Sequence, residues 1–156
     1  MKRDFSNWLS SFRDSIATYS YYVDFQKVYG NVADIKVELN ILNHEITKKW
    51  GVDLSAISNQ GKMEKRFDFV VKTESQIYVI ETNFYGGGGS KLNETARSYK
   101  TLAQEVATID GVTFVWFTDG NGWRSARHNL EETFDAMEHI YCIADMENGV
   151  MGKIFK

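Results

Sequence analysis

The stretch RFDFVVKTESQIYVIETNFY, residues 66–85, decides the fold of this chain. β-Branched and aromatic residues alternate with polar ones on both sides of its middle, which is typical of two strands joined by a tight turn. A turn at Thr73-Glu74-Ser75-Gln76 sets Asp68 directly opposite Glu81. Cross-strand Cβ atoms lie about 4.5–5.5 Å apart, and like charges at that separation repel each other. A divalent cation between the two carboxylates would reverse that repulsion, so the hairpin predicts a metal site.

The same register places two more polar side chains beside the acid pair. Asn83 shares the face of Glu81, because side chains two residues apart on a strand point the same way, and Arg66 lies opposite Asn83. Together with Asp68 they form a polar square that could hold a metal, activate a water molecule and contact a phosphodiester. The alternative is a solvent-facing acid pair with Lys65 or Arg66 nearby. The strong apolar flanks favour a central hairpin.

Composition and charge limit the classes of protein to which this chain can belong. With 156 residues, 43% of them hydrophobic, the chain is predicted to form a single domain, 1–156, with a core of its own. A net charge of -3 argues against a generic basic protein that coats nucleic acid, but it permits a nuclease with locally clustered basic groups. The lone Cys142 excludes an internal disulfide and suits a reducing cytoplasm. Neither a signal peptide nor a membrane span is expected, so we predict a cytoplasmic protein without a membrane partner.

Hydrophobic periodicity predicts the elements around the hairpin. An N-terminal helical segment, 1–50, contains helices over 5–16 and 32–50, the second of which ends at Gly51. The nuclease core, 51–156, then runs in this order: a short strand at 52–58, the hairpin, a helix capped by Ser90 and ending near 109, a buried strand at 112–118, a turn at 119–122, a helix at 123–137 and a last strand at 141–144. This order predicts an α/β fold whose mixed sheet has four or five strands flanked by helices. Its first three strands should form an antiparallel meander, followed by a helical crossover.

Several motifs of the core resemble one family of nucleases. Asp68 followed by Glu81-x-Asn83 is similar to the Asp…(Asp/Glu)-x-Lys signature of the restriction-endonuclease-like superfamily. More specific stretches resemble the DpnII/MboI type II restriction endonucleases, namely VDLSAI at 52–57, KRFDF at 65–69, ETNFY at 81–85, SKLNETARSYK at 90–100 and TDGNGW at 118–123. The resemblance covers about 52–145, and the block with Trp8 and 21–41 also looks like that family's N-terminus. It implies a restriction-endonuclease-like core that uses Mg²⁺ to cut double-stranded DNA at GATC.

The resemblance also implies roles for four residues of this chain. Asp68 and Glu81 match the metal-binding acids, so Mg²⁺ is the expected cofactor. Asn83 stands where the superfamily usually has a lysine that orients or activates the attacking water, and an amide supplies no charge. Lys91, just past the glycine run 86–89, could reach back as the missing cation; the alternative is a solvated lysine at the start of a helix.

Other side chains could assist this site. Glu94 or, from the helix expected over 32–50, Glu38 or Glu45 could supply an additional acid, although each also suits an ordinary surface position. The candidate contacts to DNA are Arg66, Gly87, Gly88, Ser90 and Arg97.

The main departure from the family is length. A long segment that separates the opening block from Val52-Asp53-Leu54 in the family is missing here. The expected function is therefore that of a compact endodeoxyribonuclease in restriction–modification or phage defence, as a homodimer because cutting both strands of a palindrome favours two-fold symmetry. The alternative, favoured by the missing segment and by Asn83, is a non-catalytic DNA-binding module or a degenerate remnant of such a nuclease.

Overall fold

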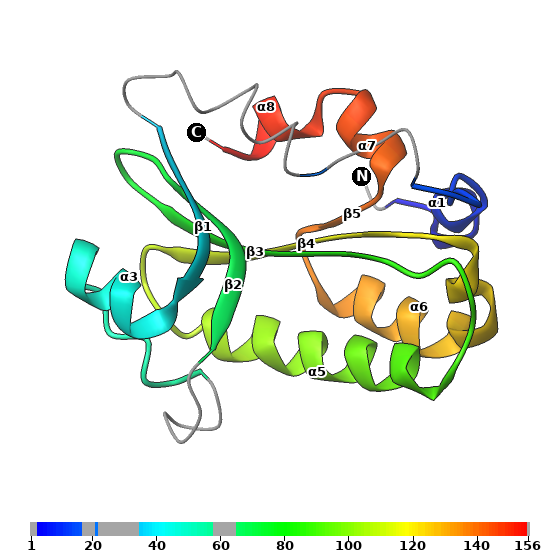
Figure 1. The fold of residues 1–156 in the computed structure, drawn as a ribbon, viewed down its shortest axis with the longest axis horizontal. Coiled ribbons are helices and arrows are strands. Elements are labelled where there is room, and N and C mark those ends of the chain that lie inside the picture. Colours follow the sequence, from blue (N-terminus) through cyan, green and yellow to red (C-terminus); the bar gives the residue numbers. More distant parts are fainter. Residues whose placement is uncertain (1–2, 17–20, 22–34, 58–64, 156) are drawn as a thin grey trace.

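The computed structural model describes residues 3–16, 21, 35–57 and 65–155. Over these residues the chain has an α/β fold, with a mixed five-stranded sheet in the order β1-β2-β3-β4-β5. The first three strands pair antiparallel, whereas β3–β4 and β4–β5 pair parallel. Helices α5 and α6 lie on one face of the sheet, and α7 and α8 lie on the other (Figure 1). The predicted fold class is confirmed.

The elements have the following bounds. The strands are β1 (Lys36–Leu42), β2 (Arg66–Lys72), β3 (Ile77–Phe84), β4 (Val112–Asp119) and β5 (Ile140–Tyr141). The helices are α1 (Phe5–Ser10), α3 (Asn43–Trp50), α5 (Ser90–Val106), the 3₁₀ helix η1 (Asn121–Ala126), α6 (Arg127–Ala136), α7 (Ile143–Glu147) and α8 (Val150–Ile154). No helix in these described ranges is both long and apolar enough to cross a bilayer.

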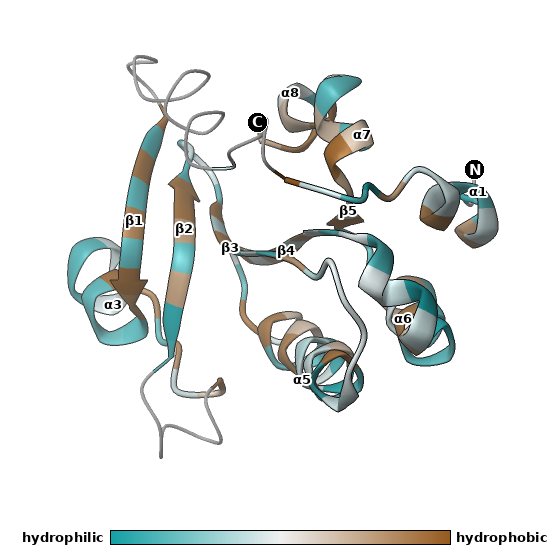
Figure 2. Cartoon of the chain, turned by 45° about the vertical axis from the view of Figure 1, so that its right-hand side comes forward, coloured by the Kyte–Doolittle hydropathy of each residue, from teal (hydrophilic) through white to brown (hydrophobic). Residues whose placement is uncertain are grey.

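The hairpin and the crossover that follows it are confirmed. Thr73 N–H donates to Gln76 O at 2.9 Å, which closes the predicted turn. Phe69 pairs with Ile80 and Val70 pairs with Val79, which is the predicted register. Helix α5 then carries the chain to β4, which lies parallel to β3. Hydrophobic and hydrophilic residues alternate around the turns of α5 (Figure 2), and its buried side is Leu92, Ala96, Leu102 and Val106.

The helix predicted over 32–50 is wrong for 36–42. Those residues form β1, which pairs antiparallel with β2, and the helix begins only at Asn43. Apolar residues at 35, 39, 42 and 46 fit a helical period, but Val37, Leu39 and Ile41 also alternate with period two, and pairing with β2 favours the strand. Residues 32–34 lie outside the described part of the chain.

The strand predicted at 52–58 is also wrong over 52–57. This stretch forms a turn, in which Ser55 N–H donates to the Asp53 carboxylate at 2.9 Å; position 58 lies outside the described residues. The first strand of the meander is therefore β1, which comes from the segment expected to be helical. The edge strand β1 therefore belongs to residues 1–50, which were predicted to be a helical segment separate from the core.

Smaller differences concern the ends of elements. Helix α1 ends at Ser10 instead of 16, and β5 ends at Tyr141 because the chain enters α7 at Ile143. Ser90 is not a cap: Gly89 occupies the N-cap position of α5, and no side chain caps the helix there. The predicted turn at 119–122 runs directly into η1.

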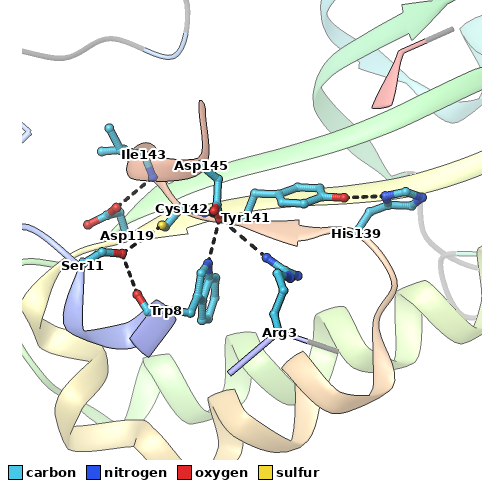
Figure 3. A network of polar contacts seen from close by, with 9 residues as sticks. All are labelled: Arg3, Trp8, Ser11, Asp119, His139, Tyr141, Cys142, Ile143 and Asp145. Carbon is cyan, nitrogen blue, oxygen red and sulfur yellow. Dashed lines mark hydrogen bonds and ion pairs between the residues drawn. The ribbon is translucent and has the colours of Figure 1, made fainter. Parts of the chain in front are cut away.

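A polar network attaches the N-terminal segment to the C-terminal helices (Figure 3). Asp145 accepts from Trp8 Nε1 and from Cys142 N–H, both at 2.9 Å. Asp119, which is fully buried, accepts from Arg13 N–H and Gly120 N–H at 2.7 Å through one oxygen and from Ile143 N–H at 2.9 Å through the other. The acid of the TDGNGW motif is thus a structural junction between the end of β4 and both terminal segments.

The glycines of the same motif allow two loops to cross. A Cβ at Gly120 or Gly122 would collide with the backbone of Tyr85, and Gly122 N–H donates to Tyr85 O at 2.8 Å. Tyr85 N–H in turn donates to Asp119 O at 3.0 Å. The TDGNGW turn therefore holds the start of the glycine run against the end of β4.

Candidate active site

Asp68 and Glu81 come together where the β2–β3 ladder ends. The last backbone pair of this ladder is Phe69 with Ile80. Beyond this pair, Thr82 N–H of β3 donates to Asp68 Oδ2 of β2 at 2.9 Å. On its other side Glu81 lies beside Trp116 of β4. This position in the middle of the sheet leaves Glu81 only 3% exposed, so the acid is buried and not on an open surface.

Burial and the neighbouring Asp68 change the acidity of Glu81. Burial, followed by hydrogen bonding and charge repulsion from Asp68, raises the pKa of Glu81 from 4.5 to about 8, and Lys65 opposes this rise. At neutral pH the metal-free site therefore keeps a proton on Glu81, because a negative charge buried beside Asp68 would cost too much. A divalent cation would stabilise both carboxylates, and Mg²⁺ needs only one or two protein carboxylates because it keeps several waters.

Lys65 completes the charged cluster. Its Nζ lies in direct contact with Oε1 of Glu81. The ammonium also lies 5.4 Å from the ring centroid of Phe67 and 5.7 Å from that of Tyr99 on α5. Sequence reasoning treated Lys65 only as a counter-ion for an exposed acid pair. Its place in the KRFDF motif, which also contains Asp68, was the available signal.

Asn83 is held by the sheet and by α5. Its Oδ1 accepts from Trp116 Nε1 at 3.2 Å and from the Thr118 hydroxyl. The Tyr99 hydroxyl is hydrogen-bonded to Asn83, while burial and the nearby Glu81 and Asp68 raise the pKa of Tyr99 well above its ordinary value. The oxygen of the Asn83 amide is thus already occupied by β4. A role for Asn83 in binding the attacking water stays a prediction.

The structure does not bring Lys91 or Glu94 to the acid pair. Both side chains are exposed near the start of α5, and within the described ranges no hydrogen bond or ion pair joins either of them to Asp68 or Glu81. Glu38 lies on β1 opposite Val70, where Lys49 Nζ binds it at 2.6 Å, and Glu45 lies in the first turn of α3. Among the residues described, no group of three or more His, Cys, Asp or Glu side chains is arranged to hold a metal. The candidate centre is therefore the two-carboxylate pair.

The candidate DNA contacts divide into two groups. Gly87, Ser90 and Arg97 are exposed between the end of β3 and the second turn of α5, and Gly87 has open space around it. Gly88 packs against Ser125, and the Arg66 guanidinium donates to Asn40 O. The first group is available to a phosphate backbone as it stands, whereas Arg66 has a structural partner.

Comparison with known proteins identifies the family. The model described as DpnII restriction endonuclease matches residues 4–49 and 43–153. The chain belongs to the DpnII restriction endonuclease family. The resemblance inferred from the motifs is therefore confirmed.

Named members of the DpnII family show how much of their length is present here. The chain is 54% identical over 111 residues to the type II restriction enzyme DpnII of Streptococcus pneumoniae, an alignment that covers 71% of the chain and 38% of that enzyme. Over 85 residues it is 46% identical to the type II restriction enzyme MboI of Moraxella bovis, covering 54% of the chain and 30% of that enzyme. Over 113 residues it is 37% identical to the type II restriction enzyme MjaIII of Methanocaldococcus jannaschii, covering 70% and 38% respectively. The chain thus spans less than two fifths of the length of these relatives. No solved structure matches it.

The buried acid of this DpnII-family site predicts an unusual pH dependence of stability. Because the folded state raises the pKa of Glu81 from 4.5 to about 8, it binds more protons than the unfolded state between these values. The metal-free protein should therefore lose stability as pH rises through this window, by on the order of a few kcal/mol, and should level off above it. Urea unfolding at several pH values in EDTA would measure this decline, and subtraction of the Glu81→Gln profile would isolate Glu81. An unchanged slope in that variant would contradict the assignment.

Proposed function

We propose that this chain is a Mg²⁺-dependent endodeoxyribonuclease that hydrolyses phosphodiesters of double-stranded DNA. The observation that carries the proposal is the pair of carboxyl groups, Asp68 beside the buried Glu81, with a lysine ammonium at its edge. Such a pair is costly in the metal-free protein and becomes favourable when a divalent cation binds. Membership in a family of restriction endonucleases supports the same reaction.

Each residue of the site has a role in this proposal. Asp68 and Glu81 would hold Mg²⁺, which when bound polarises the phosphodiester and makes water a better nucleophile. The backbone N–H of Thr82 orients the Asp68 carboxylate. Asn83, positioned by Trp116 and Thr118, orients the water through its amide group. Gly87, Ser90 and Arg97 would contact the phosphate backbone.

The finer substrate assignment comes from the resemblance. GATC is the proposed target, and restriction–modification or phage defence is the proposed context, in the cytoplasm. A homodimer is proposed because a palindromic target is cut on both strands.

The second candidate function is a non-catalytic DNA-binding module or a remnant of a nuclease. One observation favours it, namely that the alignment with DpnII of Streptococcus pneumoniae covers only 38% of that enzyme. The exposed surface at Gly87, Ser90 and Arg97 could still contact DNA if the acid pair no longer bound a metal.

Cleavage of duplexes that differ only in one GATC site separates these functions. With Mg²⁺ we expect cutting of the GATC duplex, none in EDTA, and a change in rate when the GATC adenine is methylated. Binding of the duplex without strand breaks at any protein concentration would favour the DNA-binding module. Equal cutting of the GATC, methylated and scrambled duplexes would reject GATC as the target while keeping the nuclease.

A further inference from the structure

We propose that Lys65 supplies the cationic group of this nuclease site, donating from Nζ to a non-bridging phosphate oxygen during DNA hydrolysis. This inference rests on the proposed nuclease function and deepens it. Sequence comparison with the superfamily signature left this role vacant at Asn83 and pointed to Lys91. The contacts of Lys65, Lys91 and Asn83 in the structure favour Lys65 for this role.

The backbone places Lys65 rigidly with respect to the acid pair. Lys65 directly precedes β2, and its carbonyl oxygen accepts from Asn43 N–H at 2.9 Å, where β1 passes into α3. Asp68 follows three residues later on the same strand. The distance from the Lys65 backbone to the acid pair is therefore set by the sheet and does not depend on a flexible loop.

The ammonium of Lys65 also has neighbours that fix its position. Its ammonium approaches the rings of Phe67 and Tyr99 at 5.4 and 5.7 Å and reaches Glu81, while 27% of the side chain stays exposed. Lys65 thus spans from the buried acid to the solvent. A phosphate bound beside the acid pair would therefore have this partly exposed ammonium within its surroundings.

The two rival groups are less suited to the role. The Asn83 oxygen is occupied by Trp116 and Thr118, and an amide carries no charge to offset a phosphorane. Lys91 is exposed at the start of α5 and makes no described contact with the acid pair. Of these three residues, Lys65 alone reaches Glu81 with a positive charge.

The step that Lys65 assists is balanced without any redox partner. The oxygen of a water molecule forms a new bond to phosphorus, and its proton passes to solvent. The bond from phosphorus to the leaving oxygen breaks with its electron pair, and that oxygen takes a proton from water. Lys65 stays protonated throughout and offsets the charge that grows on the non-bridging oxygens, an effect worth about 10²–10³-fold in rate when one such donor is removed.

Single-turnover cleavage of a GATC duplex tests the assignment. Lys65→Met should lower the rate constant at least about 10²-fold, a larger factor than its loss of duplex affinity measured with Ca²⁺ in place of Mg²⁺. Lys48→Met, an exposed lysine on α3, is the matched control and should cut at the wild-type rate. A larger loss in Lys91→Met than in Lys65→Met would overturn the proposal in favour of Lys91.

Chemical rescue distinguishes a charge effect from a packing effect. Lys65→Cys can be alkylated with 2-bromoethylamine to rebuild a lysine-like ammonium, because the only native cysteine, Cys142, is 1% exposed and shielded. Cleavage should return with this reagent and not with iodoacetamide, which adds a neutral group. Equal rescue by both reagents would overturn the electrostatic role.

A structure of the metal-free protein completes the test, because it needs neither metal nor DNA. The Lys65 ammonium should lie in contact with the Glu81 carboxyl group. A Lys65 side chain turned away from Glu81 would remove the contact on which the inference depends. Wild-type protein that leaves every duplex uncut would instead reject the nuclease function itself, and with it the role of Lys65.

Discussion

We expect Glu81→Gln to abolish the proposed magnesium-dependent cleavage, with a fall in rate of at least about 10³-fold, yet to leave the protein as stable as wild type or more stable above neutral pH. The two effects have one cause. In the metal-free protein Glu81 keeps its proton to a pH of about 8, and glutamine resembles this protonated form in shape and charge. The variant therefore avoids the cost of ionising a buried acid, but it cannot offer a carboxylate to the cation.

Measurement of cleavage and of urea unfolding on the same preparations checks this pair of results. Asp68→Asn should show a similar loss of cleavage, because the amide oxygen can still accept from Thr82 N–H while the negative charge is gone. Glu74→Gln, an exposed acid in the hairpin turn, is the matched control for both readouts. Wild-type cleavage by Glu81→Gln, or a clear loss of its stability at pH 8, would show that Glu81 serves the fold and not the reaction.

We expect Asp119→Ala to destabilise the fold by on the order of 3–5 kcal/mol. Asp119 is fully buried, and its two oxygens accept from Arg13, Gly120 and Ile143 N–H groups. Its removal leaves three backbone donors without a partner, each at a cost of about 1–3 kcal/mol, partly relieved if water enters. The same change releases the N-terminal segment and the start of α7 from the end of β4.

The free energy of unfolding in urea measures this loss. Asp110→Ala, at an exposed position in the turn between α5 and β4, should change it by no more than about 0.5 kcal/mol. A loss of less than about 1 kcal/mol for Asp119→Ala would contradict the junction role, because a single unpaired buried donor already costs that much.

The fold was predicted best in segments whose hydrophobic residues follow a single periodicity. The hairpin has a strict alternation and a turn that Thr73 and Gln76 close, so its register, and with it the approach of Asp68 to Glu81, followed from the sequence. The segment 36–42 satisfied both the helical and the strand period. This segment is a strand because it pairs with β2, and its periodicity alone does not indicate which strand it pairs with.

The placement of the candidate site residues was predicted where it follows strand register and missed where it follows packing. The acid pair is a property of the hairpin, and the family was recognisable from short motifs. The Lys65 ammonium that reaches Glu81 also lies beside Tyr99 of α5, which is far along the chain. Sequence spacing alone therefore suggested Lys91, the lysine nearest to the glycine run, and gave no reason to prefer Lys65.

By itself the sequence determined the hairpin, its register and the pairing of two like charges, because cross-strand neighbours follow directly from a tight turn. Only the tertiary structure decided that Glu81 is buried, that Asn83 is bound by Trp116 and Thr118, and that Lys65 is the cation in contact with the acid pair. The physical reason is that desolvation depends on every neighbour around a group. For Glu81 those neighbours come from β2, β4 and α5, which only the folded chain brings together.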